Sequence, residues 1–183
     1  MKQGLLLIDI QNDYFPGGKY ELEAPEKAAE ETAKVLKYFR ERNLPIFHIC
    51  HINTSLNAAF FKPNSVGTEF FKTVAPKENE TKIIKHSPDS FLKTNLKEKL
   101  EAKGITHLVV CGMMTHMCVD TTVRAAAKYG YDVTLISDAC ATRDLVWEDE
   151  VISAKEVQGA FLAALASGFA KVIKAEKWLK MQE

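Results

Sequence analysis

The sequence lacks an excess of charge of either sign and lacks long apolar runs. Its 24 Lys and Arg residues are balanced by 24 Asp and Glu residues, so the charge gives no indication of nucleic acid or an anionic membrane as a partner. No apolar run approaches the roughly 20 residues that span a bilayer, and the first residues lead into a short strand rather than into the apolar region of a signal peptide. We therefore expect a cytoplasmic protein.

Paired cysteines are also missing. Cys50, Cys111, Cys118 and Cys140 are widely separated, without C-x-x-C spacing, which argues against a disulfide framework or a zinc knot. Cys50, Cys111 and Cys140 lie in or beside apolar strand segments, where cysteine packs as a small hydrophobic side chain. Cys118 differs from them, because it follows an apolar strand and a glycine-containing turn at the expected start of a helix.

Short apolar runs alternate with amphipathic segments along the chain. Strands are predicted at residues 4–10, 44–52, 82–85, 106–110, 132–136 and 171–173, and helices at residues 25–42, 91–103 and 157–167. This order predicts an α/β fold, a Rossmann-like three-layer sandwich with a mostly parallel six-stranded sheet, in a single domain over residues 1–183. Residues 53–80 have weak periodicity, and a loop of that length is usually functional or wraps a neighbouring subunit.

Three reactive side chains are predicted to converge at one edge of this sheet. Ligands of open parallel sheets bind beyond the carboxyl ends of the strands, and Asp9, Lys85 and Cys118 follow or end three different strands. Alone, Asp9 could cap a helix and Lys85 could be a solvated lysine. Together, a buried acid and amine compensate each other's charge. A thiol at a helix N-terminus is expected to be a thiolate.

Three segments resemble the motifs of the isochorismatase-like cysteine hydrolases, the superfamily that includes the nicotinamidases. They are residues 6–15 (LLIDIQNDYF), 82–91 (KIIKHSPDSF) and 112–119 (GMMTHMCV). The resemblance covers nearly the whole chain. It implies hydrolysis of an amide-type C–N bond of a small molecule through a covalent thioester-like intermediate. Cys118 would be the nucleophile, Asp9 the general base and Lys85 the cation that supports both.

The same resemblance implies further features of the site and the assembly. A non-proline cis peptide would join Met113 to Met114, and the backbone N–H groups of Met114 and Cys118 would form an oxyanion hole. Relatives in this superfamily commonly form homo-oligomers, as dimers or larger assemblies. The sequence motifs do not identify the substrate.

The metal motif of the nicotinamidases is missing. The corresponding region, residues 48–55 (HICHINTS), has no Asp-x-His pair. His48 and His51 are three residues apart, a spacing that points them to opposite faces of a strand. We therefore predict no metal and no cofactor, with His48 in the core. The candidate substrate-binding residues are Phe15, His51, Phe91 and His116.

Other functions remain as alternatives. A metal-dependent nicotinamidase would need a different ligand set. A non-hydrolytic thiol-redox protein would need a resolving cysteine. A non-catalytic scaffold would be expected to have lost one of Asp9, Lys85 and Cys118, and all three are present. A nucleotide-binding Rossmann protein would carry a glycine-rich loop after the first strand, where this chain has Asp-Ile-Gln-Asn-Asp-Tyr.

Overall fold

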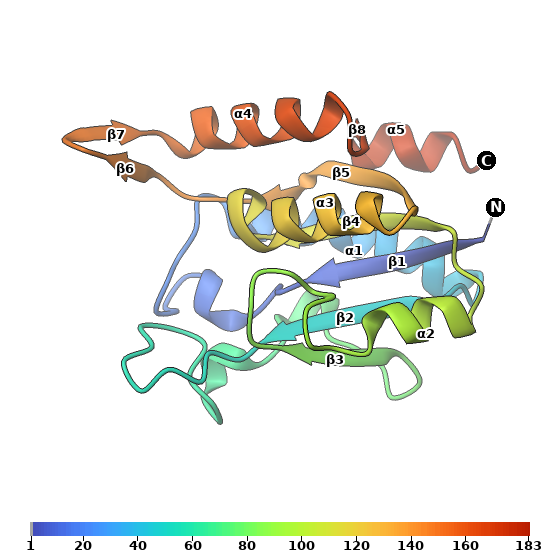
Figure 1. Ribbon diagram of the computed structural model, residues 1–183, viewed down its shortest axis with the longest axis horizontal. Helices are drawn as coiled ribbons and strands as arrows, with labels where there is room; N and C mark the ends of the chain where they lie inside the picture. The colour runs from blue at the N-terminus through green and yellow to red at the C-terminus, as the bar shows by residue number, and fades with distance from the viewer. Residues whose placement is uncertain (1) are drawn as a thin grey trace.

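The computed structural model describes residues 2–183 and has a six-stranded sheet as its central layer (Figure 1). The strand order is β3-β2-β1-β4-β5-β8, and every neighbouring pair is parallel. This confirms the predicted α/β sandwich with a parallel sheet. The strands are β1 (Gln3–Ile8), β2 (Ile46–His51), β3 (Thr81–Lys85), β4 (His107–Met113), β5 (Asp132–Ala141) and β8 (Lys171–Ile173).

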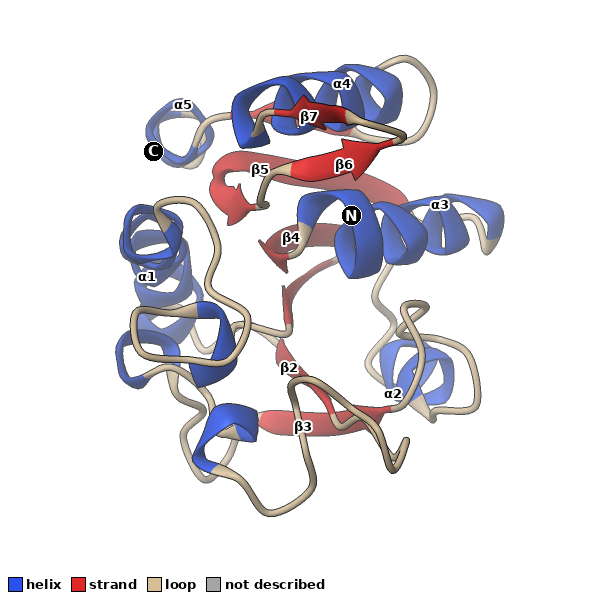
Figure 2. Ribbon diagram, turned by 90° about the vertical axis from the view of Figure 1, so that its left-hand side faces the viewer, coloured by secondary structure: helices blue, strands red, loops and turns tan. Residues whose placement is uncertain are grey.

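Helices cover both faces of the sheet, as Figure 2 shows for α1 on one side and for α2 and α3 on the other. Their apolar residues belong to two separate buried clusters, one with α1 and α5 and the other with α2, α3 and α4. Because both faces are covered, the central strands are apolar on both sides. The helices are α1 (Pro25–Glu41), α2 (Leu96–Ala102), α3 (Asp120–Lys128), α4 (Ala154–Ala166) and α5 (Ala175–Lys180).

Strand β1 shows why its sequence is a continuous apolar run. Leu5 and Leu7 belong to one buried cluster, whereas Leu6 and Ile8 belong to the other, as expected from the alternation of side chains along a strand. Near the end of the adjacent β4, Gly112 (φ 149°) lies so close that a Cβ would be 2.3 Å from the carbonyl oxygen of Ile8. Only glycine permits this approach, which brings the turn after β4 against the end of β1.

Some element boundaries differ from the prediction. The helix expected at residues 91–103 begins only at Leu96, because residues 90–95 form turns. The strands expected at 106–110 and 132–136 continue to Met113 and Ala141, and their pairing resumes after an irregularity between Val110 and Gly112.

The sequence analysis did not predict the antiparallel hairpin of β6 (Leu145–Trp147) and β7 (Glu150–Ile152). Its strands are short and exposed, so they show no alternation between apolar and polar residues. Residues 53–80 form an extended connection with short 3₁₀ turns at Val66–Thr68 and Lys72–Val74. Among residues 2–183, no helix combines the length and apolar character needed to span a bilayer.

Candidate active site

The side chains of Asp9, Lys85 and Cys118 meet beyond the carboxyl ends of β1, β3 and β4. Lys85 Nζ lies 2.7 Å from Asp9 Oδ2 and donates a hydrogen bond to Cys118 Sγ at 3.1 Å. Since β2 separates β3 from β1 in the sheet, the long lysine side chain is needed to reach across it. All three residues are buried. The structure therefore brings together the acid, amine and thiol that the sequence placed on separate strands.

His51, at the end of β2, is the fourth member of this cluster. Its Nδ1 is 3.0 Å from Lys85 Nζ and 3.8 Å from both Asp9 Oδ2 and Cys118 Sγ. Burial, followed by the charge of Lys85, lowers the pKa of His51 to about 4. The imidazole is therefore neutral near pH 7, and Nδ1 accepts a hydrogen bond from the Lys85 ammonium.

The Lys85 Nζ atom is surrounded by more hydrogen-bond acceptors than it has N–H bonds to donate. Besides Asp9, His51 and Cys118, its Nζ donates to the carbonyl oxygen of Ser87 at 2.9 Å. Burial alone would lower the pKa of Lys85, but the opposing effect of Asp9, together with that of Cys118, raises it above its ordinary value. Lys85 is therefore an ammonium with three N–H bonds, and four acceptors compete for them.

Burial disfavours the thiolate of Cys118 in this environment. Burial, followed by the charge of Asp9, raises the pKa of Cys118, and the lowering effect of Lys85 does not reverse this. Cys118 also lies inside a π-helical turn, Thr115–Val119, and α3 begins only at Asp120. Desolvation of the sulfur thus opposes the thiolate expected from a helix N-terminus, because burial favours the neutral form of the thiol.

Asp9 is placed to receive the proton of this thiol. It has a left-handed backbone conformation, with φ of 51°, and its side chain is fully buried. Apart from the ion pair with Lys85, neither carboxylate oxygen accepts a hydrogen bond from residues 2–183. A carboxylate oxygen and Cys118 Sγ lie within 4.8 Å of each other, so the carboxylate has acceptor capacity beside the sulfur.

The turn that carries Cys118 contains a cis peptide bond between Met113 and Met114. The turn is held to the end of β5 by Thr115, whose hydroxyl donates to the carbonyl oxygen of Ala141 at 3.2 Å. Both Met113 and Met114 are buried. The turn that carries Cys118 is thus fixed between β4 and β5.

Gln11 supports the site, although the sequence analysis did not single it out. Its amide nitrogen donates to the carbonyl oxygens of His51 (3.0 Å) and Thr68 (2.9 Å), and its amide oxygen accepts from the backbone N–H of His51 at 2.8 Å. The side chain is completely buried. Gln11 therefore fixes the backbone of His51 from both sides. The only signal in the sequence was an amide side chain directly after a buried strand.

Tyr14 is a second residue that the sequence analysis missed. Burial, followed by the charges of Cys118 and Asp9, raises the pKa of its phenol well above the ordinary value, which places Tyr14 near the triad. Its ring packs edge-on against Phe61, with 4.7 Å between the ring centroids, and the Phe61 ring lies 5.9 Å from that of His51. Tyr14 and Phe61 thus form an aromatic wall beside the reactive groups.

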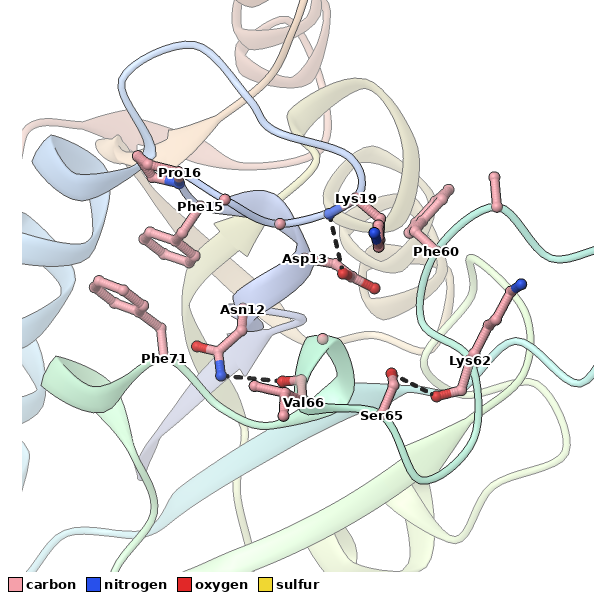
Figure 3. Close-up of a pocket in the computed structure, with 14 residues that line it drawn as sticks. Asn12, Asp13, Phe15, Pro16, Lys19, Phe60, Lys62, Ser65, Val66 and Phe71 are labelled. Carbon is pink, nitrogen blue, oxygen red and sulfur yellow. Dashed lines mark hydrogen bonds between the residues drawn. The ribbon is translucent and has the colours of Figure 1, made fainter.

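Phe15, predicted to bind substrate, faces a different space from its neighbour Tyr14. Its ring stacks on Phe71, with 3.5 Å between the centroids and 3° between the planes. Both rings line a cavity of about 510 Å³ (Figure 3). None of Asp9, His51, Lys85 and Cys118 is among the residues that line this cavity.

Phe91 and His116 also make contacts outside the triad. The ring of Phe91 packs near those of Tyr129 and Tyr131, at centroid distances of 5.1 and 6.1 Å. His116 Nδ1 lies 2.5 Å from the hydroxyl oxygen of Thr142. These contacts give both residues packing and hydrogen-bonding roles, so of the four predicted substrate-binding residues the structure places only His51 beside Lys85 and Cys118.

Asp9, His51 and Cys118 have the spacing of metal ligands, since their donor atoms lie within 4.8 Å of one another. However, Lys85 Nζ is within 3.1 Å of a donor atom of each of them. The ammonium fills the position that a cation would take, and its positive charge opposes a second cation there. The donor set is therefore suited to a lysine and not to a metal ion.

His48 belongs to a different cluster from His51. Its Nε2 lies 2.8 Å from a carboxylate oxygen of Glu80, and the same oxygen accepts a hydrogen bond from Arg40 at 2.9 Å. Burial lowers the pKa of His48 to about 4, so the imidazole is neutral near pH 7. As predicted, His48 is buried, and it connects β2 with the segment before β3.

Comparison with known proteins identifies the family of this chain. A sequence profile of the isochorismatase domain matches residues 3–177. The chain belongs to the isochorismatase family. The isochorismatase family protein YddQ of Bacillus subtilis is 50% identical over 98% of this chain and 100% of its own length. The match to this family confirms the resemblance that the three sequence motifs carried.

Two further relatives extend the comparison. A solved structure of a family member from Oleispira antarctica has a TM-score of 0.94 and 42% identity, and the match covers 98% of this chain and 96% of that one. A streptothricin hydrolase from Streptomyces noursei is 33% identical over 78% of this chain and 51% of its own length. The fold of the Oleispira antarctica protein is thus shared over 98% of this chain.

Proposed function

We propose that this isochorismatase-family protein is a cysteine hydrolase that cleaves an amide-type C–N bond of a small molecule. The observation that carries the proposal is the position of Lys85 Nζ, 2.7 Å from Asp9 and 3.1 Å from Cys118. A general base, a nucleophile and a cation that supports both are thereby in one buried cluster. The name of the streptothricin hydrolase relative supports hydrolytic chemistry.

The first half of the reaction forms a thioester. As Cys118 Sγ attacks the carbonyl carbon, its proton passes to the carboxylate of Asp9, and an S–C bond forms. The backbone N–H groups of Met114 and Cys118 stabilise the developing oxyanion, and one such donor typically contributes about 100- to 1,000-fold to the rate. The C–N bond then breaks, and Asp9 returns the proton to the leaving nitrogen.

The second half hydrolyses the thioester. Asp9, again a carboxylate, takes a proton from a water molecule whose oxygen attacks the thioester carbon. The C–S bond breaks, the proton returns to Cys118, and a carboxylic acid leaves. Because burial raises the pKa of the Cys118 thiol, proton transfer to Asp9 accompanies the attack in each cycle. Lys85 stays an ammonium throughout.

His51, Tyr14 and Phe61 define the substrate side of the site. His51 is 16% exposed at its side chain, whereas the Asp9 and Lys85 side chains are inaccessible. We assign His51 as a substrate contact, with the rings of Tyr14 and Phe61 beside it. A metal-dependent nicotinamidase is disfavoured, since residues 48–55 lack the Asp-x-His pair of the nicotinamidases.

An acyl-trapping experiment tests this function without knowledge of the natural substrate. The protein is incubated with p-nitrophenyl acetate, and the acylated cysteine is located by peptide mass spectrometry. Cys118 is expected to be acylated, and the Cys140→Ala variant is expected to behave like the unmodified protein. A screen of small amides, cyclic amides and ureides then identifies the substrate class, with Cys118→Ala as the inactive control.

The acyl-trapping experiment and the amide screen can also contradict the proposal. If Cys118→Ala hydrolyses the ester or any amide as fast as the Cys140→Ala variant, Cys118 is not the nucleophile. Circular dichroism of both variants establishes that the fold is retained.

A further inference from the structure

The β6–β7 hairpin, which we call the arm (residues 145–152), carries an exposed apolar surface. The exposed fractions are 69% for Val146, 70% for Trp147 and 67% for Val151. The two strands pair with each other and with no strand of the six-stranded sheet, and Figure 1 shows the arm projecting beyond the end of α4. An isolated two-stranded hairpin is marginally stable in water, so the arm needs a surface to cover it.

The tip of the arm is acidic. Trp147 is followed by Glu148, Asp149 and Glu150, and all four residues are exposed. The arm thus presents one large aromatic side chain directly beside three carboxylates. A complementary surface would combine an aromatic pocket with positive charge.

The cavity of about 510 Å³ has both properties. Phe15, Phe60 and Phe71 contribute apolar walls, and Lys19 and Lys62 line it as well. Figure 3 shows the stacked Phe15 and Phe71 on one side and Phe60, Lys19 and Lys62 on the other. Among the ion pairs of residues 2–183, none involves Lys19 or Lys62.

The cavity also contains one carboxylate, that of Asp13. Its two oxygens already accept hydrogen bonds from the backbone N–H groups of Lys19 (3.1 Å) and Phe61 (2.6 Å), and the side chain is buried. Those two bonds partly compensate its charge. The lysines, in contrast, are exposed and available to an acidic partner.

We propose that the arm of one copy of this chain docks into the cavity of a second copy. Trp147 lies among the three phenylalanines, and the acidic tip lies beside Lys19 and Lys62. In Figure 1 the arm and the segments that line the cavity, residues 12–19 and 59–71, lie at the end of the molecule to which β1 and β2 point, so a two-fold axis there allows each copy to receive the other's arm. Tryptophan is among the residues that contribute most to protein interfaces.

Charge reversal tests the pairing of arm and cavity. The arm variant is Glu148→Lys with Asp149→Lys, and the cavity variant is Lys19→Glu with Lys62→Glu. Sedimentation equilibrium is expected to show a dimer for the unmodified protein and a dimer dissociation constant at least about tenfold weaker for either variant alone. In an equimolar mixture of the two variants, both reciprocal contacts regain opposite charges, so heterodimers form and the dimer is restored.

Three results would overturn the inference. One is an unmodified protein that remains monomeric at high concentration. The second is a mixture that stays as dissociated as its components, which indicates that the arm packs elsewhere, for example on another arm. The third is equal weakening by the control variant, Lys82→Glu with Lys93→Glu, which changes two exposed lysines outside the cavity. Mass is measured without substrate, so the result is independent of the proposed hydrolase function.

Discussion

Lys85 and Asp9 form a fully buried ion pair, with 2.7 Å between Nζ and Oδ2. Replacing one partner of such a pair leaves an uncompensated charge in the protein interior, which costs about 3–5 kcal/mol. We therefore expect Lys85→Met to lower the free energy of unfolding by about that amount, measured by urea denaturation. Lys82→Met, an exposed position on the same strand, is the matched control. Equal stabilities for the two variants would show that the pair is not isolated from solvent.

Removal of the Lys85 side chain should also create a metal site. The donor atoms of Asp9, His51 and Cys118 are spaced for one ion, and carboxylate, imidazole and thiolate are all zinc ligands. We expect Lys85→Ala to bind about one Zn²⁺ per chain and to melt at a higher temperature when zinc is added. The unmodified protein and Lys82→Ala should show neither effect, and EDTA should leave the unmodified protein's activity unchanged. Zinc-dependent activity of the unmodified protein would contradict the assignment of Lys85.

Asp9→Asn separates the reactivity of the thiol from catalysis. Because the charge of Asp9 raises the pKa of Cys118, its removal lowers that pKa while Lys85 still favours the thiolate. Alkylation of Cys118 by iodoacetamide at pH 7 should accelerate by about tenfold for each pKa unit lost, whereas amide hydrolysis should be abolished because the general base is gone. Peptide mass spectrometry measures the labelling, with Asp120→Asn as the control. A slower reaction of Cys118 in Asp9→Asn would refute the electrostatic role of Asp9.

Gln11→Leu should act on the site through His51. The substitution removes three hydrogen bonds of a buried amide, each contributing about 0.5–1.5 kcal/mol, so we expect a loss of about 2–4 kcal/mol. If Gln11 had only a structural role, the Gln11→Leu molecules that remain folded would keep the kcat and kcat/KM of the unmodified protein. Displacement of His51 should instead lower kcat/KM. Asn12→Ala, which removes one hydrogen bond to the carbonyl oxygen of Val66, is the control.

His48 should make the stability of the protein depend on pH. Its pKa is about 4 when folded and about 6.5 when unfolded, so between these values the unfolded chain binds the extra proton. The free energy of unfolding therefore decreases as the pH falls from about 6.5 to 4, by up to about 3 kcal/mol. His48→Gln should reduce this decrease, measured by urea denaturation at several pH values. The exposed His86→Gln should retain it, and an unchanged slope in His48→Gln would contradict the assignment.

The parts of the site that could be predicted from the sequence are those that follow from sheet geometry. Asp9, Lys85 and Cys118 each end or follow a strand, and parallel strands bring their carboxyl ends to one edge. The long side chain of Lys85 explains how β3, which is not adjacent to β1, contributes to the cluster.

The parts that could not be predicted depend on contacts between distant segments. Gln11 binds residues 40 and 57 positions away, and such hydrogen bonds leave no local pattern. Phe15 and Tyr14 are adjacent in the chain, yet they face the cavity and the triad respectively. The raised pKa of Cys118 could not be predicted either, because it follows from burial of the sulfur, which the sequence does not quantify.

The competition of four acceptors for the three N–H bonds of Lys85 has a consequence during turnover. When Asp9 takes the thiol proton it becomes neutral and attracts the ammonium less, while negative charge passes through the attacking sulfur to the substrate oxygen. The ammonium can then shift its hydrogen bonding from oxygen to sulfur by a small rotation of its terminal group. The hydrogen bonds of Lys85 would thus adjust as the negative charge moves, and the cluster together with the bound substrate would keep the same net charge at every stage.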